Sequence, residues 1–263
     1  MRAAGAPAVQ RLSGFTDDEP GTSICGVECH GRIRSVVLTY DDGPEPGGTE
    51  RILETLARRE ASATFFVPLS RVRRCPGLFA DAVAAGHEIG LRGLDHQRLT
   101  AFTPAAVQRR TTAAKEELED ALGRSVRWFR PPYGIQSAAT WGAVTKVGLT
   151  PVLWTTTLED WLDIPTRAHL DAASAMDGPG AIVLAHDGFA TTDDGVDDGP
   201  APHLDRGDLS RLLLDRYAAM DLVGCSLGRA LESGPPREAD LAGLTTQFHG
   251  TGAVIGTGDA SSQ

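Results

Sequence analysis

Acidic, basic and imidazole side chains follow directly after several short apolar runs of this sequence. The clearest are Asp41 and Asp42 after the run 34–40, Arg130 at the end of 126–130, Asp160 after 149–156, and His186 at the end of 180–186. If these runs are parallel strands of one barrel, the side chains meet at its carboxyl-terminal mouth, where barrel enzymes carry out their chemistry. A carboxylate there can accept a proton and a histidine can donate one. The spacing therefore predicts an acid–base site.

The elements that would position these residues are short apolar strands alternating with longer helices. The apolar runs are 34–40, 62–69, 87–91, 126–130, 149–156, 180–186 and 221–227. They are continuous rather than alternating, which is typical of parallel strands covered by helices. The pattern at 104–122 starts with Pro104 and is followed by Gly123, and it predicts the clearest helix. We predict an α/β fold, and one barrel fits the length of 263 residues.

The charge and hydropathy of the chain argue against two classes of partner. It has 25 basic and 35 acidic residues and a net charge of −10. Nothing therefore concentrates the positive potential with which proteins bind nucleic acids or anionic membranes. No apolar run reaches the roughly 20 residues of a spanning helix, and the first residues lack the apolar core of a signal peptide. We expect a cytoplasmic protein with a small-molecule substrate, either neutral or cationic.

Composition divides the chain into three parts. We predict an N-terminal extension at 1–31, a middle domain at 32–233 and a C-terminal tail at 234–263, because both ends are weakly periodic and rich in small or polar residues. Within the middle part, residues 188–207 (GFATTDDGVDDGPAPHLDRG) form a long acidic loop. A loop of this length is usually a lid or a disordered segment.

Five short motifs occur in a fixed order along the chain. They are TYDDGP at 39–44, GHEIG followed by DH within 86–96, RPPYG at 130–134, DW at 160–161 and LAHD at 184–187. In this set the chain resembles the polysaccharide deacetylase family, the NodB-homology or carbohydrate esterase family 4 domain. The resemblance implies that 32–233 is a single domain with a distorted (β/α)7-type, TIM-like barrel. It also implies a hydrolase that removes an acetyl group from the nitrogen of a small soluble substrate, such as an amino sugar or a natural-product intermediate.

The resemblance implies a role for most residues of these motifs. Asp41 would be the general base, oriented by Arg130, and His186 would be the general acid, oriented by Asp160. The other residues are Tyr133, whose backbone N–H would bind the oxyanion, Trp161 and Leu184, which would line the acyl pocket, and Asp42 and His96, which would be two of three metal ligands. The metal, zinc or cobalt, would polarise the carbonyl and lower the pKa of the attacking water.

An arginine stands where the resemblance implies the third metal ligand. The family pattern is H-x-x-x-H, and with His96 as its second histidine the first falls on Arg92. A guanidinium has five donors and no lone pair, so it cannot bind a cation. At about 5 Å and an effective dielectric of about 20, its charge would repel a divalent ion by about 6 kcal/mol, roughly four powers of ten in affinity.

Three arrangements of Arg92 remain open. Arg92 pairs with Asp42 and presents a fixed positive charge to the oxyanion of the substrate, or it swings outward while Asp95 or water supplies the missing ligand. In the third, the protein is a scaffold that binds its substrate without turnover. A change of His to Arg at position 92 that inactivated the enzyme would be one origin of such a scaffold. A different class of function is a metal-free lyase, cyclase or isomerase that keeps the acid–base set Asp41, Arg130, Asp160 and His186.

Other reactive residues have simpler interpretations. His87 lies near the start of its apolar run, toward the opposite end of a barrel, and we interpret it as structural. His203 lies in the acidic loop and is interpreted as a solvated side chain. The four cysteines are too widely spaced for a disulfide framework, so we expect free thiols.

Overall fold

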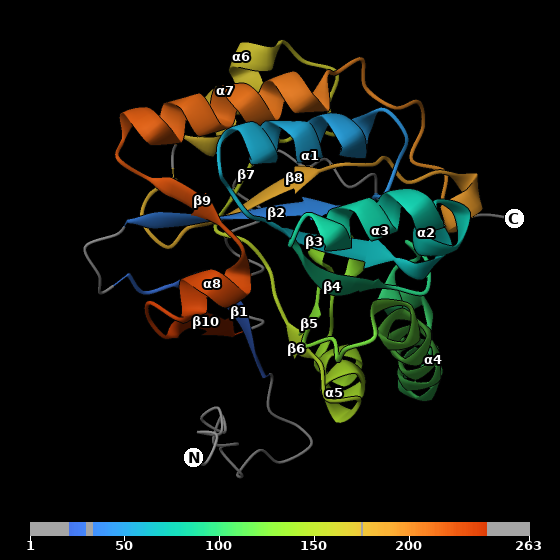
Figure 1. The fold of residues 1–263 in the computed structure, drawn as a ribbon. Coiled ribbons are helices and arrows are strands. Elements are labelled where there is room, and N and C mark those ends of the chain that lie inside the picture. The colour runs from blue at the N-terminus through green and yellow to red at the C-terminus, as the bar shows by residue number, and fades with distance from the viewer. Residues whose placement is uncertain (1–20, 30–33, 175, 241–263) are drawn as a thin grey trace, which may run out of the picture.

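A parallel β-sheet that curls into a half-barrel lies at the centre of the protein (Figure 1). The computed structural model describes residues 21–29, 34–174 and 176–240. The strand order is β6-β5-β4-β3-β2-β8-β7, with β9 beside β2, and all these pairings are parallel. The strands are β2 (Ser35–Asp41), β3 (Thr64–Pro68), β4 (Glu88–Gly93), β5 (Trp128–Phe129), β6 (Thr150–Pro151), β7 (Thr156–Thr157), β8 (Ile182–His186) and β9 (Val223–Cys225). The predicted α/β fold of the distorted (β/α)7, TIM-like type is confirmed.

The apolar run 149–156 departs from the expectation of one strand. It forms β6 and the first residue of β7, and the chain changes partners between them. The N–H of Val152 donates to Phe129 of β5, whereas that of Leu153 donates to Ile24, which lies far away in the sequence. The prediction was wrong here because backbone pairing with distant segments divides the run.

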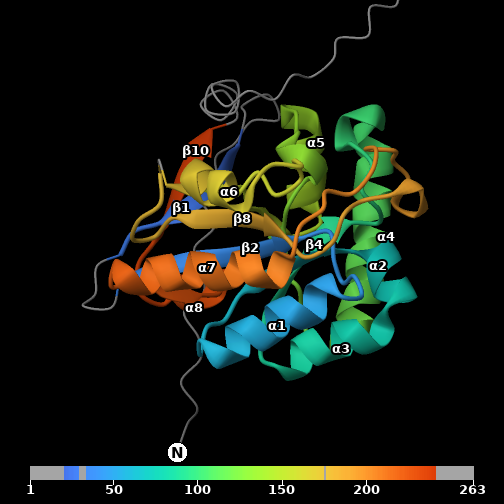
Figure 2. The ribbon, with the colours of Figure 1, turned by 90° about the horizontal axis from the view of Figure 1, so that it is seen from above.

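Helices cover the outside of the sheet. They are α1 (Gly48–Arg58), α2 (Leu69–Arg74), α3 (Pro76–Ala84), α4 (Pro104–Leu122), α5 (Ala138–Lys146), α6 (Thr166–Ala173), α7 (Arg206–Ala219) and α8 (Leu227–Leu231), with short 3-10 turns η1 (Leu99–Ala101), η2 (Pro132–Gly134) and η3 (Thr192–Asp194). Helices α1 and α7 lie side by side across β2 and β8, as Figures 1 and 2 show. Among the described helices, none combines the length and apolar character needed to cross a bilayer.

Helix α4 has the bounds predicted from the sequence. The Thr103 hydroxyl accepts a hydrogen bond from the N–H of Ala106 and so caps the first turn. Gly123 ends the helix with a φ of 65°, a left-handed conformation that glycine adopts without strain. The helix buries one face, made of Val107, Thr111, Ala114 and Leu118. Residues three and four apart lie on the same side of a helix, so these four side chains form one continuous stripe against the core.

Alternation along the central strands determines which side chains reach the mouth of the barrel. Successive residues of a strand point to opposite faces. On β2, Leu38 and Tyr40 pack in the large cluster under the helices. Val37 packs instead in a smaller interior cluster that includes Phe66. Because Asp41 has the same parity as Val37, the last side chain of β2 points to the interior.

Parts of both predicted flanks are built into the fold. Strand β1 (Thr22–Val27) pairs antiparallel with β10 (Pro236–Asp240), and Ile24 is buried in the interior cluster. The described parts of the N-terminal extension and the C-terminal tail therefore contain two strands that pair with each other. The remainder of both flanks, at 1–20, 30–31 and 241–263, lies outside the described residues. The domain boundaries themselves stay a prediction.

Candidate active site

Four charged side chains meet at the carboxyl ends of neighbouring strands. Asp41 and His186 are the last residues of β2 and β8 and are paired in register. Arg92 lies near the end of β4, and Arg130 directly follows β5. Their side chains are 0%, 11%, 3% and 0% exposed, for Asp41, His186, Arg92 and Arg130 in turn. The structure thus brings the predicted acid–base residues into one small, buried region.

Arg130 fixes one oxygen of Asp41. Its Nη1 donates to Oδ1 of Asp41 at 2.8 Å and to the hydroxyl of Thr39 at 2.7 Å. Its other nitrogens donate to the carbonyl oxygens of Val152 and Leu153. Burial lowers the pKa of Arg130 to about 10, so the guanidinium stays charged at neutral pH. Arg130 therefore lies where the resemblance implied a residue that orients the base.

The guanidinium of Arg92 lies between both aspartates and a histidine. Its Nε donates to Oδ1 of Asp42 at 2.8 Å, and its Nη1 is 2.7 Å from Oδ2 of Asp41. Nη1 also donates to the carbonyl of Pro131, and Nη2 is 3.1 Å from Nε2 of His96. Burial alone would lower the pKa of Arg92, but the two carboxylates raise it. Of the three arrangements left open, the structure has Arg92 paired inward and not swung outward.

The two predicted metal ligands are directed at Arg92. Nε2 of His96 lies 3.2 Å from Oδ1 of Asp42, the oxygen that also accepts from Arg92. Burial acts to raise the pKa of Asp42, but the charges of Arg92 and His96 hold it well below its usual value. Asp95, the alternative third ligand, instead accepts from Arg110 at 2.6 Å. It therefore does not replace the ligand missing at position 92.

A divalent ion does not fit this set of donors. The free electron pairs of Asp42 and His96 face a guanidinium, which has no lone pair to share and carries a like charge. Across 21–29, 34–174 and 176–240, no three or more His, Cys, Asp or Glu side chains are grouped so as to hold a metal ion. The residues present thus disagree with the zinc or cobalt that the resemblance implies.

His186 is held by a carboxylate, as the sequence predicted. Its Nδ1 is 2.7 Å from Oδ1 of Asp160, and its backbone N–H donates to Oδ2 of the same residue. Burial alone would lower the pKa of His186, but the carboxylates of Asp160, Asp42 and Asp41 together raise it above its ordinary value. Arg206, the first residue of α7, donates to Asp160 at 2.9 Å. Sequence reasoning missed Arg206, because an arginine that begins a helix after a long loop belongs to no motif.

The residues predicted to contact the substrate lie at two depths. Tyr133 has a left-handed backbone, with φ of 59°. The centroid of its ring lies 4.5 Å from the centroid of the His96 ring. Trp161 is partly exposed and packs edge-on against His186 at 5.6 Å. Leu184 is buried in the interior cluster, two residues before the end of β8. Tyr133 and Trp161 therefore border the site, whereas Leu184 lies beneath it.

The acidic loop 188–207 is anchored beside the site. Asp194, at the end of η3, is fully buried and accepts hydrogen bonds from Arg71 and Arg74. The backbone carbonyl of Asp194 accepts from the N–H of His96 at 2.9 Å. Of the two alternatives for this loop, a lid or a disordered segment, the structure shows an ordered loop against the site.

The histidines interpreted as structural or solvated lie away from the acid–base residues. His87 precedes β4, at the amino end of the strand, and packs 5.3 Å from the ring of Phe65. Burial lowers the pKa of His87. The side chain of His203 is 93% exposed and lies 3.5 Å from Asp163. The described cysteines are all free thiols, as expected.

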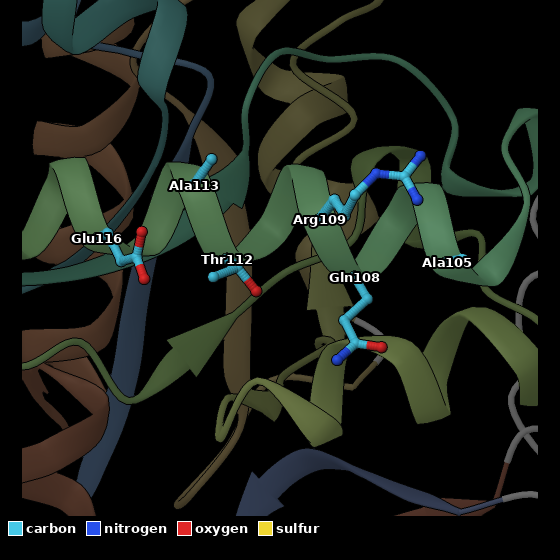
Figure 3. Close-up of a pocket in the computed structure, with 6 residues that line it drawn as sticks. All are labelled: Ala105, Gln108, Arg109, Thr112, Ala113 and Glu116. Carbon is cyan, nitrogen blue, oxygen red and sulfur yellow. The ribbon is translucent and has the colours of Figure 1, made fainter.

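A hollow of about 430 Å³ lies on the outer face of α4 (Figure 3). It is lined by Ala105, Gln108, Arg109, Thr112, Ala113 and Glu116. Residues at this spacing form one side of a single helix, and none of them belongs to the motifs or to the acid–base set. We therefore assign the active site from the convergence of charged groups and not from the size of this hollow.

Comparison with known proteins identifies the family. A sequence model of polysaccharide deacetylases matches residues 30–152. A chitooligosaccharide deacetylase of Bradyrhizobium sp. (strain ANU 289) is 36% identical over 157 residues, which are 59% of this chain and 72% of that protein. The peptidoglycan-N-acetylglucosamine deacetylase PgdA of Listeria monocytogenes is 36% identical over 163 residues, which are 60% of this chain and 34% of PgdA.

The fold is also found in a solved member of the same class. The family 4 carbohydrate esterase from Streptomyces lividans, in complex with acetate, is 26% identical, with a TM-score of 0.63 over 75% of this chain and 93% of that one. The chain therefore belongs to the polysaccharide deacetylase family. This confirms the resemblance carried by the five motifs. The predicted class of enzyme, a deacetylase-type amide hydrolase, is also confirmed at the level of the family.

Proposed function

We propose that the protein removes the acetyl group from the nitrogen of an N-acetylated amino sugar, with a guanidinium in place of a metal ion. The family and the pairing of Asp41 with His186 support the first part. The second part depends on one observation. The guanidinium of Arg92 lies within 3.1 Å of Asp41, Asp42 and His96 at the same time.

Asp41 supplies the base. Its Oδ1 is fixed by Arg130, but its Oδ2 accepts no hydrogen bond from the described residues. The 2.7 Å contact of Oδ2 with Arg92 is an ion pair without the geometry of a hydrogen bond. Oδ2 therefore keeps a lone pair that can take a proton from the water that attacks the acetyl carbon.

His186 and Arg92 act on the other atoms of the amide. Asp160 holds Nδ1 of His186, so Nε2 is left to face the site, 3.8 Å from Oδ2 of Asp42. From there the protonated ring donates to the amide nitrogen as the C–N bond breaks, which leaves acetate and a free amine. The buried charge of Arg92, together with the backbone N–H of Tyr133, stabilises the negative oxygen of the tetrahedral intermediate.

Binding without hydrolysis is the second candidate. It is favoured by the two guanidinium groups that lie against Asp41, because protonation of this carboxylate weakens two buried ion pairs at once. The metal-free lyase, cyclase or isomerase considered from the sequence would use the same acid–base pair, but its reaction would release no acetate.

Acetate release from N-acetylglucosamine oligomers separates these functions. We expect acetate from the wild-type protein and a rate lower by about 100-fold or more in His186→Ala, because general acid catalysis contributes at least this much. His203→Ala is the matched control, since that histidine is exposed. Oligomer binding without acetate would favour the second candidate. Absence of both binding and acetate would contradict the proposed function.

A further inference from the structure

Arg206 is buried at the start of α7, with its charge against Asp160. Its side chain is 9% exposed. Nη1 of Arg206 donates to Oδ2 of Asp160 at 2.9 Å and to the backbone carbonyl of His186 at 3.1 Å. The same nitrogen lies 3.5 Å from the backbone carbonyl of Asp160. One guanidinium nitrogen thus contacts both members of the acid pair, Asp160 and His186.

The stability of α7 does not explain an arginine at this position. The first turn of a helix carries a partial positive charge, so a cation there is unfavourable. The cap of α7 is Asp205, whose side chain accepts from the N–H of Asp208 at 3.1 Å. The charge of Arg206 is instead compensated by Asp160, which lies 46 residues earlier in the chain. The acid pair therefore accounts for the position of this arginine.

The backbone that carries Arg206 is held against α1. A Cβ atom at Gly207 would lie 2.5 Å from the Cβ of Arg51, so only a glycine permits this approach of the two helices. The hydroxyl of Thr55 donates to the carbonyl of Gly207 at 3.3 Å. Arg206 therefore reaches Asp160 from a fixed point of the fold.

Both oxygens of the Asp160 carboxylate are engaged. Its side chain is 1% exposed. Oδ1 binds Nδ1 of His186, whereas Oδ2 accepts from the backbone N–H of His186 and from Arg206. Burial acts to raise the pKa of Asp160, but the charges and hydrogen bonds of His186 and Arg206 lower it. Asp160 is therefore a buried anion that depends on these two partners.

One of the two partners loses its charge during the reaction. In the proposed function His186 gives its proton to the amide nitrogen as the C–N bond breaks, and the ring becomes neutral. A buried carboxylate without a counter-charge is strongly unfavourable. A guanidinium stays protonated, and among the described residues Arg206 is the one arginine or lysine that pairs with Asp160. Arg206 thus compensates Asp160 before and after the proton is transferred.

We propose that Arg206 is a positioning residue for the general acid. It holds the Asp160 carboxylate toward His186 and balances its charge in both states of the imidazole, so that the ring keeps its orientation while it gives up its proton. Arg206 acts through Asp160 and not on the substrate. This inference deepens the proposed function and rests on it for the proton transfer that Arg206 assists.

A double-mutant cycle tests whether Arg206 acts through Asp160. Arg206→Met removes the charge and retains a long side chain, and it should lower kcat for acetate release from N-acetylglucosamine oligomers by about 10-fold or more, the effect of one hydrogen bond between charged groups. KM should stay the same. In an Asp160→Asn background the same change should lower kcat by less than about twofold, because the group on which Arg206 acts is gone. A purely structural role would give equal losses in both backgrounds.

Proton NMR tests the same inference without turnover. The proton between Nδ1 of His186 and Oδ1 of Asp160, atoms 2.7 Å apart, should give a far-downfield signal that is absent in Asp160→Asn. Arg206→Met should broaden or remove this signal, because the carboxylate loses one of its donors. Arg206→Lys keeps the charge and should restore part of the signal and of kcat. Arg211→Met is the matched control, since Arg211 is an exposed arginine of the same helix.

The outcomes separate this inference from the proposed function. Equal losses of kcat in the two backgrounds, or the same signal in Arg206→Met and the wild type, would overturn the role of Arg206 even if acetate is released. A signal that depends on Arg206 in a protein that releases no acetate would contradict the proposed function alone. If neither acetate nor the signal is found in the wild type, both fail. Arg206→Gln, which keeps a donor without the charge, takes the place of Arg206→Met if that variant does not fold.

Discussion

Nη1 of Arg92 lies 2.7 Å from Oδ2 of Asp41, and both side chains are buried. Neighbouring buried carboxylates need positive charge close by, because desolvation of an unpaired charge costs several kcal/mol. Arg130 supplies it to one oxygen of Asp41, and Arg92 supplies it to the other and to Asp42. In this chain, then, the cation beside the two aspartates is a side chain.

Replacement of Arg92 by histidine should create a site for a divalent ion. The change removes a repulsion of about 6 kcal/mol and adds an imidazole to Asp42 and His96, so affinity for zinc or cobalt should rise by about four powers of ten. Calorimetric titration of both proteins measures this. Arg73→His is the matched control, since Arg73 is exposed and paired with Glu117. Equal affinities of the wild type and Arg92→His would show that Arg92 is not at the ligand position.

Removal of the charge of Asp160 should shift the pH profile of acetate release. Burial acts to lower the pKa of His186, and Asp160, together with Asp42 and Asp41, raises it above its ordinary value. In Asp160→Asn the burial remains and the charge is gone, so His186 loses its proton at lower pH. The alkaline limb of kcat/KM should move to lower pH, because the acid must be protonated. Asp163→Asn, which changes an exposed aspartate, is the control. A limb that stays in place would exclude His186 as the acid.

Asp187 should make stability fall as the pH rises. Burial raises its pKa from 3.8 to about 7, although Thr49 and Gly43 donate hydrogen bonds to it. Between these values the unfolded chain has released the proton and the folded chain retains it. The free energy of unfolding therefore decreases through this window, by at most about 1.4 kcal/mol per pH unit, and levels off above it. Asp187→Asn cannot ionise and should decline less in denaturant titrations at several pH values. Parallel curves would contradict the raised pKa.

Adjacent aspartates provide a matched test of the loop anchor. Asp194 is buried and paired with Arg71, whereas Asp193 is 77% exposed and lies 3.6 Å from Arg74. Removal of one partner of a buried pair costs about 3–5 kcal/mol, and an exposed pair contributes less than about 1 kcal/mol. Asp194→Ala should therefore lower the free energy of unfolding far more than Asp193→Ala. Similar losses in the two variants would show that the buried pair does not hold the loop.

The meeting of Asp41, Arg130 and His186 could be predicted from the sequence. Each follows the apolar run of a parallel strand, and such strand ends share one mouth. The role of Arg206 could not be predicted. Arg206 lies at the end of the acidic loop, and the path of that loop depends on the pairing of Asp194 with Arg71, residues far apart in the chain. Arg206 belongs to no motif.

Other features depend on contacts that a local pattern does not contain. The run 149–156 divides because Leu153 pairs with Ile24, which lies near the start of the chain. The sequence left open whether the side chain of Arg92 points inward or outward, because its orientation depends on which hydrogen-bond acceptors lie within its reach. In the structure Asp42, Pro131 and His96 are there, so the side chain stays inside. The cytoplasmic location stays a prediction.

The metal dependence of acetate release tests the role of Arg92 most directly. The protein is treated with a chelator, dialysed, and assayed on N-acetylglucosamine oligomers with and without zinc or cobalt. We predict the same rate in all these conditions, because the guanidinium of Arg92 already supplies the charge beside Asp41 and Asp42. A rate that disappears after chelation and returns with zinc or cobalt would contradict the proposal that Arg92 takes the place of the ion.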